Sequence, residues 1–366
     1  MTNFNQIISK IIKYQLILLV GILVLVEGLL IYQLAYICWY DQQPVMTKNI
    51  TINNINNAEN LISRRIDGLV VDKGRENLTP VAVTIDNHFD SWPNYGLSGA
   101  SVVYETCVEG SATRFLAIYT PEKDSGELAK IGPIRSTRPY FVELAKEYGA
   151  LLAHSGGSPA GLKRIEELGV SNLEEIAWWG PDYFWRVYSR PAPHNLFTSS
   201  DNLAHGVVDW QLKDKMPDYQ AWQFNVQIKT NNSETANKIK IKFSAADVYN
   251  AAYEYGTTTQ SYLRFQGNEK QIDALNNKQL AVQNVVIQFV PQEVVLDNEG
   301  RIKLNLIGQG NAWIFRDGLI IRGNWQKSDY NSRTIFYDET GNEIKFKPGN
   351  TWIEILPGKK EVIISS

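Results

Sequence analysis

The stretch Ile131–Pro159, IGPIRSTRPYFVELAKEYGALLAHSGGSP, predicts two helices and the strand that lies between them. Pro139 suits the first turn of a helix, which we expect to end at Gly149 because a glycine commonly follows a helix. Ala150–His154 is a short apolar run that is typical of a buried strand. A second helix should follow the glycine-rich turn and end at Gly169. With the strands expected before it, this order of elements favours a mixed α/β fold.

A glycine-rich turn joins the expected strand to the second helix, and two arginines precede that strand. A turn between a strand and a helix start presents backbone N–H groups, which bind anions well. Arginine adds a planar guanidinium group that binds a carboxylate or a phosphate through two hydrogen bonds. We therefore predict an anion-binding site in this stretch, formed by Arg135, Ser136, Arg138, His154, Gly156, Gly157 and Ser158.

Three short strands before this stretch carry further polar residues at their ends. Their alternating apolar patterns predict them at Pro80–Asp86, Ser101–Glu105 and Thr113–Tyr119. A loop stiffened by two prolines, Arg190–Asn195, comes after the second helix. Residues from these segments extend the predicted ligand site, namely Asp86, Arg114, His194 and Asn195.

The arginines of this region have two interpretations. They lie beside loops or at the ends of elements, where some of their donors could bind a ligand while acidic residues hold the guanidinium groups in place. They could instead form an internal network of salt bridges that only joins strands and loops. The arginines are Arg114, Arg135, Arg138 and Arg190, and their candidate partners are Asp86, Glu105 and Glu109.

A catalytic function would require an acid–base pair or a nucleophile. Glu105 or Glu109 with His154 is the natural acid–base pair if a reaction occurs. Ser158 lies in a glycine turn between a strand and a helix, as the serine of a nucleophile elbow does. Pro159 lacks the backbone N–H that such an elbow offers to an oxyanion, so we do not expect a serine hydrolase.

Residues of metal-ligating types are present, but they form no helical H-E-x-x-H pattern, and we expect no metal or other cofactor. The histidines among them would then be hydrogen-bonded loop residues. The set comprises Asp86, His88, Glu105, Glu109, His154 and His194. No Walker A lysine or G-x-G-x-x-G motif follows a strand, so the sequence does not support nucleotide binding of those kinds.

Length, charge and cysteine content limit the class of protein. The 366 residues are enough for two domains after an N-terminal membrane segment. The chain has 36 basic and 39 acidic residues, a net charge of -3, so we expect no nucleic-acid partner. The two cysteines, Cys38 and Cys107, do not indicate a disulfide framework.

The N-terminal region predicts a membrane anchor. Leu16–Trp39 is apolar apart from two polar residues and is long enough to span a bilayer. Because lysines precede it, we expect residues 1–14 in the cytoplasm, a signal anchor at 15–39 and the remainder of the chain outside the cell membrane. Residues 40–66 should form a polar linker. A cleaved signal peptide and a lipoprotein attached through Cys38 are the alternatives.

The second half of the chain, from about Phe224, consists of short strand-like runs separated by turns. Asp317-Gly318 is typical of a tight hairpin, and the half should be mostly antiparallel sheet. We expect an N-terminal α/β domain at 67–222 and a C-terminal β-rich domain at 223–366. Its strands are expected at Ile239–Phe243, Ser261–Phe265, Val285–Val290, Ile302–Ile307, Trp313–Phe315, Leu319–Arg322, Thr334–Tyr337, Glu343–Phe346 and Trp352–Leu356.

Several motifs together resemble those of the YerB-like family of bacterial envelope proteins, from about Asp67 to the C-terminus. The resemblance implies an N-terminal and a C-terminal unit, a three-layer sandwich of two sheets and one helical layer, and attachment as a lipoprotein. The activity of the family is undefined. The matching motifs are VTIDN from Val83, VYETCVEG from Val103, TRFLAI from Thr113, IGPIRSTRPYFV from Ile131, HSGGSP from His154, APHNLFT from Ala192, GNWQK from Gly323 and PGNTWIEI from Pro348.

The chain departs from the family pattern at two points. It lacks the lipoprotein signal, because the residue before Cys38 is Ile37 rather than a small residue, and this supports a spanning anchor. Gln271 stands where the family pattern has a histidine, so we expect no site there.

These observations lead to three hypotheses about function. We expect a membrane-anchored extracytoplasmic protein that binds an anionic envelope ligand, such as a glycan, a phosphate polymer or a peptide carboxylate. The second hypothesis is an envelope hydrolase or transferase that acts through Glu105 or Glu109 and His154. The third is a structural partner of a membrane complex, which Glu27 inside the span would indicate. The expected partners are therefore the membrane and a cell-wall polymer or envelope protein.

Overall fold

The computed structural model describes residues 60–176, 180–212, 218–226 and 234–366, together with 15, 19, 21–23, 25–28 and 31–32. It divides into a first unit, Met1–Val45 with Val187–Pro191, and a second unit, Met46–Arg186 with Ala192–Ser366. The sheets, the helices and the candidate site described below belong to the second unit, and Arg190 belongs to the first.

Most of the predicted membrane span at 15–39, all of residues 1–14 and most of the predicted linker at 40–66 lie outside the described residues. Within the part of the chain that the structure describes, no helix combines the length and the apolar character that a bilayer crossing needs. The predicted linker extends too far toward the C-terminus, because its residues Leu61–Ser63 form a strand (β1). This strand pairs antiparallel with Val70–Asp72 (β2). Backbone pairing with a following segment ordered these residues, and a composition argument does not detect such pairing.

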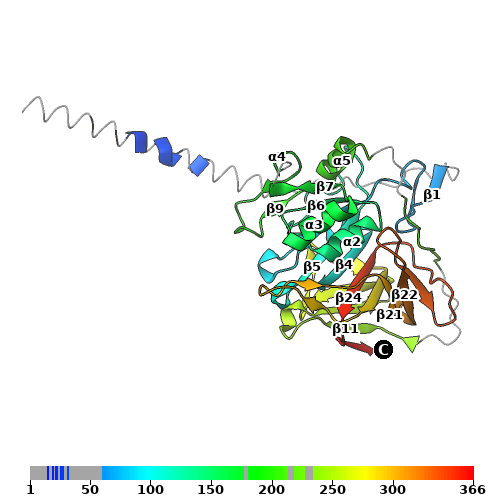
Figure 1. The fold of residues 1–366 in the computed structure, drawn as a ribbon. Coiled ribbons are helices and arrows are strands. Elements are labelled where there is room, and N and C mark those ends of the chain that lie inside the picture. The colour runs from blue at the N-terminus through cyan, green and yellow to red at the C-terminus, as the bar shows by residue number, and fades with distance from the viewer. Residues whose placement is uncertain are drawn as a thin grey trace, which may run out of the picture. The chain divides into compact units, whose positions relative to one another are not determined.

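A mixed sheet crosses the second unit and has eleven strands among the described residues (Figure 1). Its centre consists of fully buried strands, as expected when both faces of a sheet are covered. From edge to edge its strands are β10 (Glu234–Thr235), β22 (Leu319–Lys327), β21 (Gly308–Arg316), β18 (Asn284–Val290), β24 (Thr351–Pro357), β4 (Val102–Cys107), β5 (Thr113–Tyr119), β3 (Val81–Asp86), β6 (Leu151–His154) and β7 (Asn172–Glu174), with β23 (Ile335–Asp338) paired to β22.

A second sheet is antiparallel throughout and has six strands in the described part of the chain. Its order is β14 (Glu269–Lys270), β13 (Ser261–Gln266), β12 (Ala251–Gly256), β11 (Lys238–Lys242) and β25 (Glu361–Ser365), with β17 (Ala281–Val282) paired to β13. Short two-stranded pairs complete the strand content: β8 (Trp185–Arg186) with β9 (Leu196–Phe197), β15 (Ile272–Asp273) with β16 (Lys278–Gln279), and β19 (Val294–Val295) with β20 (Ile302–Lys303).

Adjacent residues of the central strand β4 face different parts of the molecule, because side chains alternate along a strand. Tyr104 donates a hydrogen bond of 2.6 Å to Glu147, which directly follows helix α2 (Pro139–Lys146). Glu105 forms an ion pair with Arg264 on β13 of the second sheet. The large sheet therefore contacts the end of a helix on one face and the second sheet on the other.

The predicted order of helix, strand and helix is confirmed, but the first helix ends at Lys146, three residues before the predicted Gly149. Helix α2 begins with Pro139, strand β6 covers Leu151–His154, and helix α3 (Pro159–Leu168) ends at Gly169 with a left-handed φ of 58°. These local signals were sufficient because proline and glycine act at helix ends whatever the tertiary context. Further helices are α4 (Gly180–Tyr183) and α5 (Ser200–Asp209), with short 3₁₀ turns η2 (Phe89–Ser91), η3 (Leu97–Gly99), η4 (Glu109–Ser111) and η6 (Asp247–Tyr249).

The C-terminal half is mostly antiparallel, as predicted, and the Asp317-Gly318 hairpin joins β21 to β22 with positive φ at both turn residues. Two strand predictions are wrong. Glu343–Phe346 forms only isolated bridges, and the Ile302–Ile307 run is reduced to the two residues of β20. Apolar alternation marks residues that become buried, and it does not ensure that a partner strand lies beside them.

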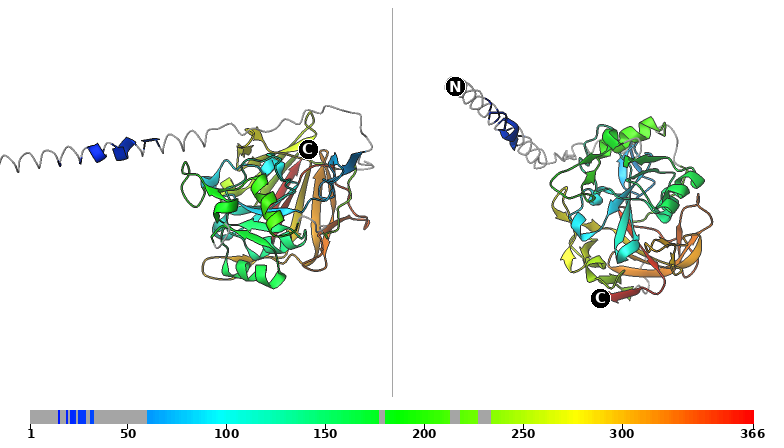
Figure 2. Two further views of the ribbon diagram at one scale, coloured as in Figure 1. Left: turned by 90° about the horizontal axis from the view of Figure 1, so that it is seen from above. Right: turned by 60° about the vertical axis from the view of Figure 1, so that its left-hand side comes forward.

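The two predicted domains contribute to one sheet. Strand β24 from the C-terminal half runs parallel to β4 from the N-terminal half, with Glu354 opposite Glu105. Figure 1 shows β24 between β4 and the β21–β22 hairpin, and Figure 2 shows strands of both halves in one body. Backbone hydrogen bonds between β24 and β4 therefore join the two predicted halves in space.

Cys107 lies at the end of β4 and is buried, and its reactivity tests this placement. Burial is the main cause that raises the pKa of its thiol to about 11. At pH 8 the fraction of Cys107 side chains in the reactive thiolate form would be on the order of one in a thousand. We expect Cys107 to resist alkylation in the folded protein and to react fully in denaturant, as measured by peptide mass spectrometry. Equal labelling of Cys107 in the native and denatured states would contradict its placement.

Candidate functional site

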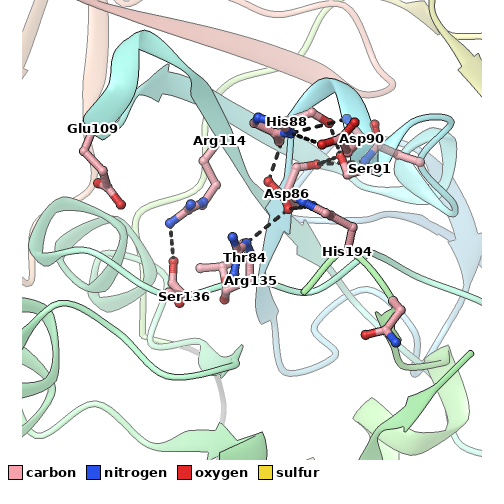
Figure 3. A network of polar contacts seen from close by, with 12 residues as sticks. Thr84, Asp86, His88, Asp90, Ser91, Glu109, Arg114, Arg135, Ser136 and His194 are labelled. Carbon is pink, nitrogen blue, oxygen red and sulfur yellow. Dashed lines mark hydrogen bonds and ion pairs between the residues drawn. The ribbon is translucent and has the colours of Figure 1, made fainter. Parts of the chain in front are cut away.

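Asp86, the last residue of β3, is the centre of a polar cluster (Figure 3). Its Oδ2 accepts hydrogen bonds from Arg135 Nε at 3.1 Å and from His194 Nδ1 at 2.7 Å. Its Oδ1 accepts one from the backbone N–H of His88 at 3.1 Å. The main chain fixes the arrangement, because the segment after the cis Gly132-Pro133 bond bridges β3 through Ile85 and Ile134. Three distant parts of the sequence thus meet at one carboxylate.

Arg114 is the cross-strand neighbour of Asp86 at the start of β5. It is buried, and its Nη1 donates a hydrogen bond of 2.8 Å to the backbone oxygen of Ser136. Among the described residues, its Nε has no hydrogen-bond partner and no carboxylate lies within 4.0 Å. Burial, followed by the charge of Arg138, lowers the pKa of Arg114 to about 10. A buried cation with this little compensation favours the binding of an anion.

Arg135 and Arg138 differ in how their donors are used. Arg138 donates hydrogen bonds to both carboxylate oxygens of Glu109, and the bond from its Nε is 2.9 Å long. Its Nη1 donates to the backbone oxygen of Thr137 at 2.8 Å. Burial opposes ionisation of Glu109, but the hydrogen bond and charge of Arg138 outweigh it and lower the pKa of Glu109. The Arg135 side chain is 28% exposed. Within the described structure, Nε is the guanidinium nitrogen that donates a hydrogen bond to another residue. Its terminal nitrogens therefore remain available to a ligand.

The predicted glycine turn is fixed by hydrogen bonds to the segment that carries the arginines and to helix α3. Ser158 caps helix α3, because its hydroxyl accepts the Gly161 N–H at 3.1 Å. The Ser155 and Ser158 N–H groups donate to the backbone oxygens of Arg135 and Thr137. These contacts tie the turn, with Gly156 and Gly157, to the segment that carries the arginines. The turn positions Arg135 and Ser136, and its Ser155 and Ser158 N–H groups are occupied.

The acid–base pair proposed from the sequence is not assembled. His154 is buried, its Nδ1 donates to the Gly156 oxygen at 2.9 Å, and burial lowers its pKa. Glu105 has no exposed surface and pairs with Arg264 between the two sheets, while Glu109 pairs with Arg138. Neither glutamate is hydrogen-bonded to His154 among the described residues. The hydrolase hypothesis therefore loses its predicted acid–base pair.

His194 and Asn195 are adjacent in sequence but belong to different sets of hydrogen bonds. His194 reaches Asp86, and its ring stacks on that of His88 with centroids 5.2 Å apart. The Asn195 side-chain oxygen accepts from Arg186 Nη1 at 2.9 Å, and Arg186 also pairs with Glu175. His194 therefore belongs to the Asp86 cluster, whereas Asn195 supports the neighbouring loop.

The sequence did not identify the buried network around Arg264. This side chain has no exposed surface, and its Nε donates to Tyr253 at 3.0 Å. Its guanidinium also contacts Glu105, Gln266 and Gln271 and lies 4.5 Å from the centre of the Trp352 ring. A signal existed in the strand SYLRFQ, where an arginine shares a face with Tyr262 and Gln266. That pattern alone does not say which face is buried.

Comparison with known proteins agrees with the family motifs. Two family models match the chain: "Protein of unknown function (DUF3048) N-terminal domain" over residues 67–213 and the corresponding C-terminal domain over residues 239–353. A Bacillus subtilis (strain 168) protein described as "Putative lipoprotein YerB" is 29% identical over 305 residues, which are 82% of this chain and 88% of that protein. The crystal structure of YerB from Bacillus subtilis is similar, with a TM-score of 0.72 and 27% identity, over 83% of this chain and 100% of the other. The chain therefore belongs to the YerB-like (DUF3048) family.

Proposed function

We propose that this protein is an extracytoplasmic envelope protein that binds an anionic ligand, through a phosphate or a carboxylate, between Arg114 and Arg135. The observation that carries the proposal is Arg114, a buried cation without a carboxylate partner among the described residues. An isolated buried charge is costly, and an anion at the surface would offset that cost. A glycan, a phosphate polymer and a peptide carboxylate all supply such a group.

Arg135 supplies the second half of the proposed site. Its Nε is held by Asp86, so the guanidinium is oriented while its terminal nitrogens face a ligand. Figure 3 draws both guanidinium groups between Glu109 on one side and Asp86 with His194 on the other. Ser136 and Arg138 act indirectly in this proposal, because their contacts with Arg114 and Glu109 shape the site.

A membrane location supports the choice of an envelope ligand. The relative from Bacillus subtilis is described as a lipoprotein, and this chain has an apolar segment at residues 15–39 that we propose as its anchor. In this proposal residues 1–14 are cytoplasmic and the folded unit lies outside. A three-layer arrangement, with helices, the large sheet and the second sheet in that order, is supported by the opposite contacts of Tyr104 and Glu105.

A binding experiment with two single variants tests the proposal. The full chain in detergent would be sedimented with purified cell-wall fractions, and the bound share compared with that of Arg114→Gln and Arg135→Gln. Loss of one charged hydrogen bond of about 1.5–3 kcal/mol predicts binding about 10- to 100-fold weaker. Raising the salt concentration should also weaken binding, because part of the site is exposed.

The matched control is Arg301→Gln, a half-buried arginine of the β19–β20 segment that pairs with Asp297. It removes the same charge elsewhere and should bind as the wild type does. Equal binding by the wild type and both site variants, with unchanged thermal stability, would refute the anion site and leave Arg114 with a structural role.

A further inference from the structure

We propose that His88, Asp90 and His194 bind one zinc ion beside the arginine site. One potential ligand atom from each residue lies within 4.8 Å of the corresponding atoms of the other two. His88 caps the short turn η2, Asp90 lies inside that turn, and His194 comes from a loop more than a hundred residues later. Two imidazoles and one carboxylate are a common protein ligand set for zinc.

The spacing of the two histidines agrees with a shared metal. Two nitrogens bound to one tetrahedral zinc at about 2 Å lie roughly 3.3 Å apart, which puts the two ring centres roughly 5 Å apart. The ring centroids of His88 and His194 are 5.2 Å apart and their planes are inclined by 18°, so the His88 ring has to turn for both nitrogens to point at one ion. Asp90 Oδ2 lies 3.4 Å from His88 Nδ1, again close to the separation of two ligand atoms on one ion.

Asp86 holds His194 as a metal-binding histidine is usually held. Its carboxylate accepts a hydrogen bond of 2.7 Å from His194 Nδ1, which leaves Nε2 with a free lone pair. Metal-bound histidines typically donate their other nitrogen to a carboxylate in this way. Asp86 is itself buried and fixed by Arg135 and by the His88 backbone N–H. The orientation of His194 therefore exists without the metal.

His88 presents its Nδ1 as an unprotonated atom. This nitrogen accepts a long hydrogen bond of 3.3 Å from the Asp90 N–H, so its lone pair points toward the Asp90 turn. A structural role as a turn cap accounts for that contact. It does not account for the stacked His194 ring or for the exposed Asp90 carboxylate beside both histidines. No helical motif marks these ligands in the sequence, because two lie in a turn and one in a distant loop.

Three protein ligands leave one position of a tetrahedral zinc ion open, as in zinc sites that bind a water or a ligand. Zinc binding can be measured without any anionic ligand, so the test does not depend on the proposed anion site. Among the described residues, Asp86 connects the two proposed sites, because it contacts Arg135 on one side and His194 on the other.

Zinc titration of the full chain in detergent tests the inference. After treatment with a chelator and dialysis, the protein would compete with a chromophoric chelator for Zn²⁺, and Co²⁺ spectra would report the geometry. We expect one Zn²⁺ per chain and visible Co²⁺ absorption typical of tetrahedral nitrogen and oxygen ligands. His88→Ala and His194→Ala should each weaken Zn²⁺ binding about 100-fold or more, and Asp86→Asn about 10- to 100-fold.

Two further variants keep the test decisive. Asp90→Asn changes a side chain that is 52% exposed, so it should fold normally and still weaken Zn²⁺ binding. His205→Ala removes an exposed histidine of helix α5 and should leave Zn²⁺ binding unchanged. The inference is overturned if the wild type binds no stoichiometric Zn²⁺, or if Asp90→Asn and both histidine variants bind it as tightly as His205→Ala does.

Discussion

Replacing Arg264 with methionine should destabilise the protein by about 3–5 kcal/mol, because the change leaves Glu105 buried without its cation. Glu105 and Arg264 both have no exposed surface, so water cannot replace the lost partner. Glu354, the neighbour of Glu105 on β24, does not compensate, since burial and then the charge of Glu105 raise its pKa well above the usual range. Urea unfolding monitored by tryptophan fluorescence measures the effect.

The double variant Arg264→Met with Glu105→Gln is the matched control. It removes both charges, and replacing a whole buried pair often costs little, so most of the lost stability should return. Arg301→Met, at a surface arginine that is only half-buried, should have little effect. A single variant as stable as the wild type would contradict the placement of Glu105, and would make this glutamate available for chemistry again.

Replacing Glu147 with glutamine should cost a similar amount, about 3–5 kcal/mol, because two buried cations depend on it. Lys327 donates to Glu147 at 2.5 Å, and Arg333 lies 3.6 Å from it, each without exposed side-chain surface. Thr334 and Tyr104 add hydrogen bonds of 2.9 Å and 2.6 Å. This carboxylate joins the end of helix α2 to the last residue of β22 and the segment that follows it, so its loss weakens contact between the two halves.

The loss should depend on pH in a defined direction. Burial opposes ionisation of Glu147, but Lys327 and Arg333 outweigh it and lower its pKa below the unfolded value of about 4.3. A lowered folded-state pKa contributes stability that is present above that value and is lost as the pH falls through the folded pKa. The difference between wild type and Glu147→Gln should therefore be full at pH 7 and shrink below about pH 4.

Glu143, one turn earlier and inside helix α2, provides the control. Burial raises its pKa to about 7, so it is partly protonated at neutral pH, and Arg164 pairs with it at 3.2 Å. Glu143→Gln keeps a hydrogen-bonding group beside Arg164, which is 21% exposed, and should cost about 1 kcal/mol. If urea unfolding gave equal losses for the two variants, or a pH-independent loss for Glu147→Gln, the role assigned to Glu147 would be wrong.

The sequence predicts local structure well where a residue acts on its own backbone. Pro139, Ser158 and Gly169 mark the ends of α2 and α3 because ring closure, a hydroxyl cap and a left-handed φ are local properties. Strands depend on partners. Glu343–Phe346 has the alternation of a strand and remains outside the named strands, since the neighbouring chain forms only isolated bridges with it.

The candidate site could be predicted by residue type and only partly by arrangement. Asp86, Arg135 and His194 were all singled out, but their contacts join positions 49 and 108 residues apart, which no local pattern encodes. Glu105 and Arg264 are 159 residues apart, and their pairing depends on how two sheets pack. Glu109 lies beside Arg138 and accepts hydrogen bonds from it. Arg135 rather than Arg138 is therefore left with free donors.

The most direct test of the anion site is to locate a heavy anion in a crystal. Crystals of residues 60–366 would be soaked in sodium tungstate, and an anomalous difference map would be calculated at a tungsten absorption edge. We predict a peak within hydrogen-bond distance of Arg114 and Arg135 that is absent from crystals of Arg114→Gln. A map with tungstate peaks only elsewhere, or with none, would contradict the proposal that these two arginines bind an anion.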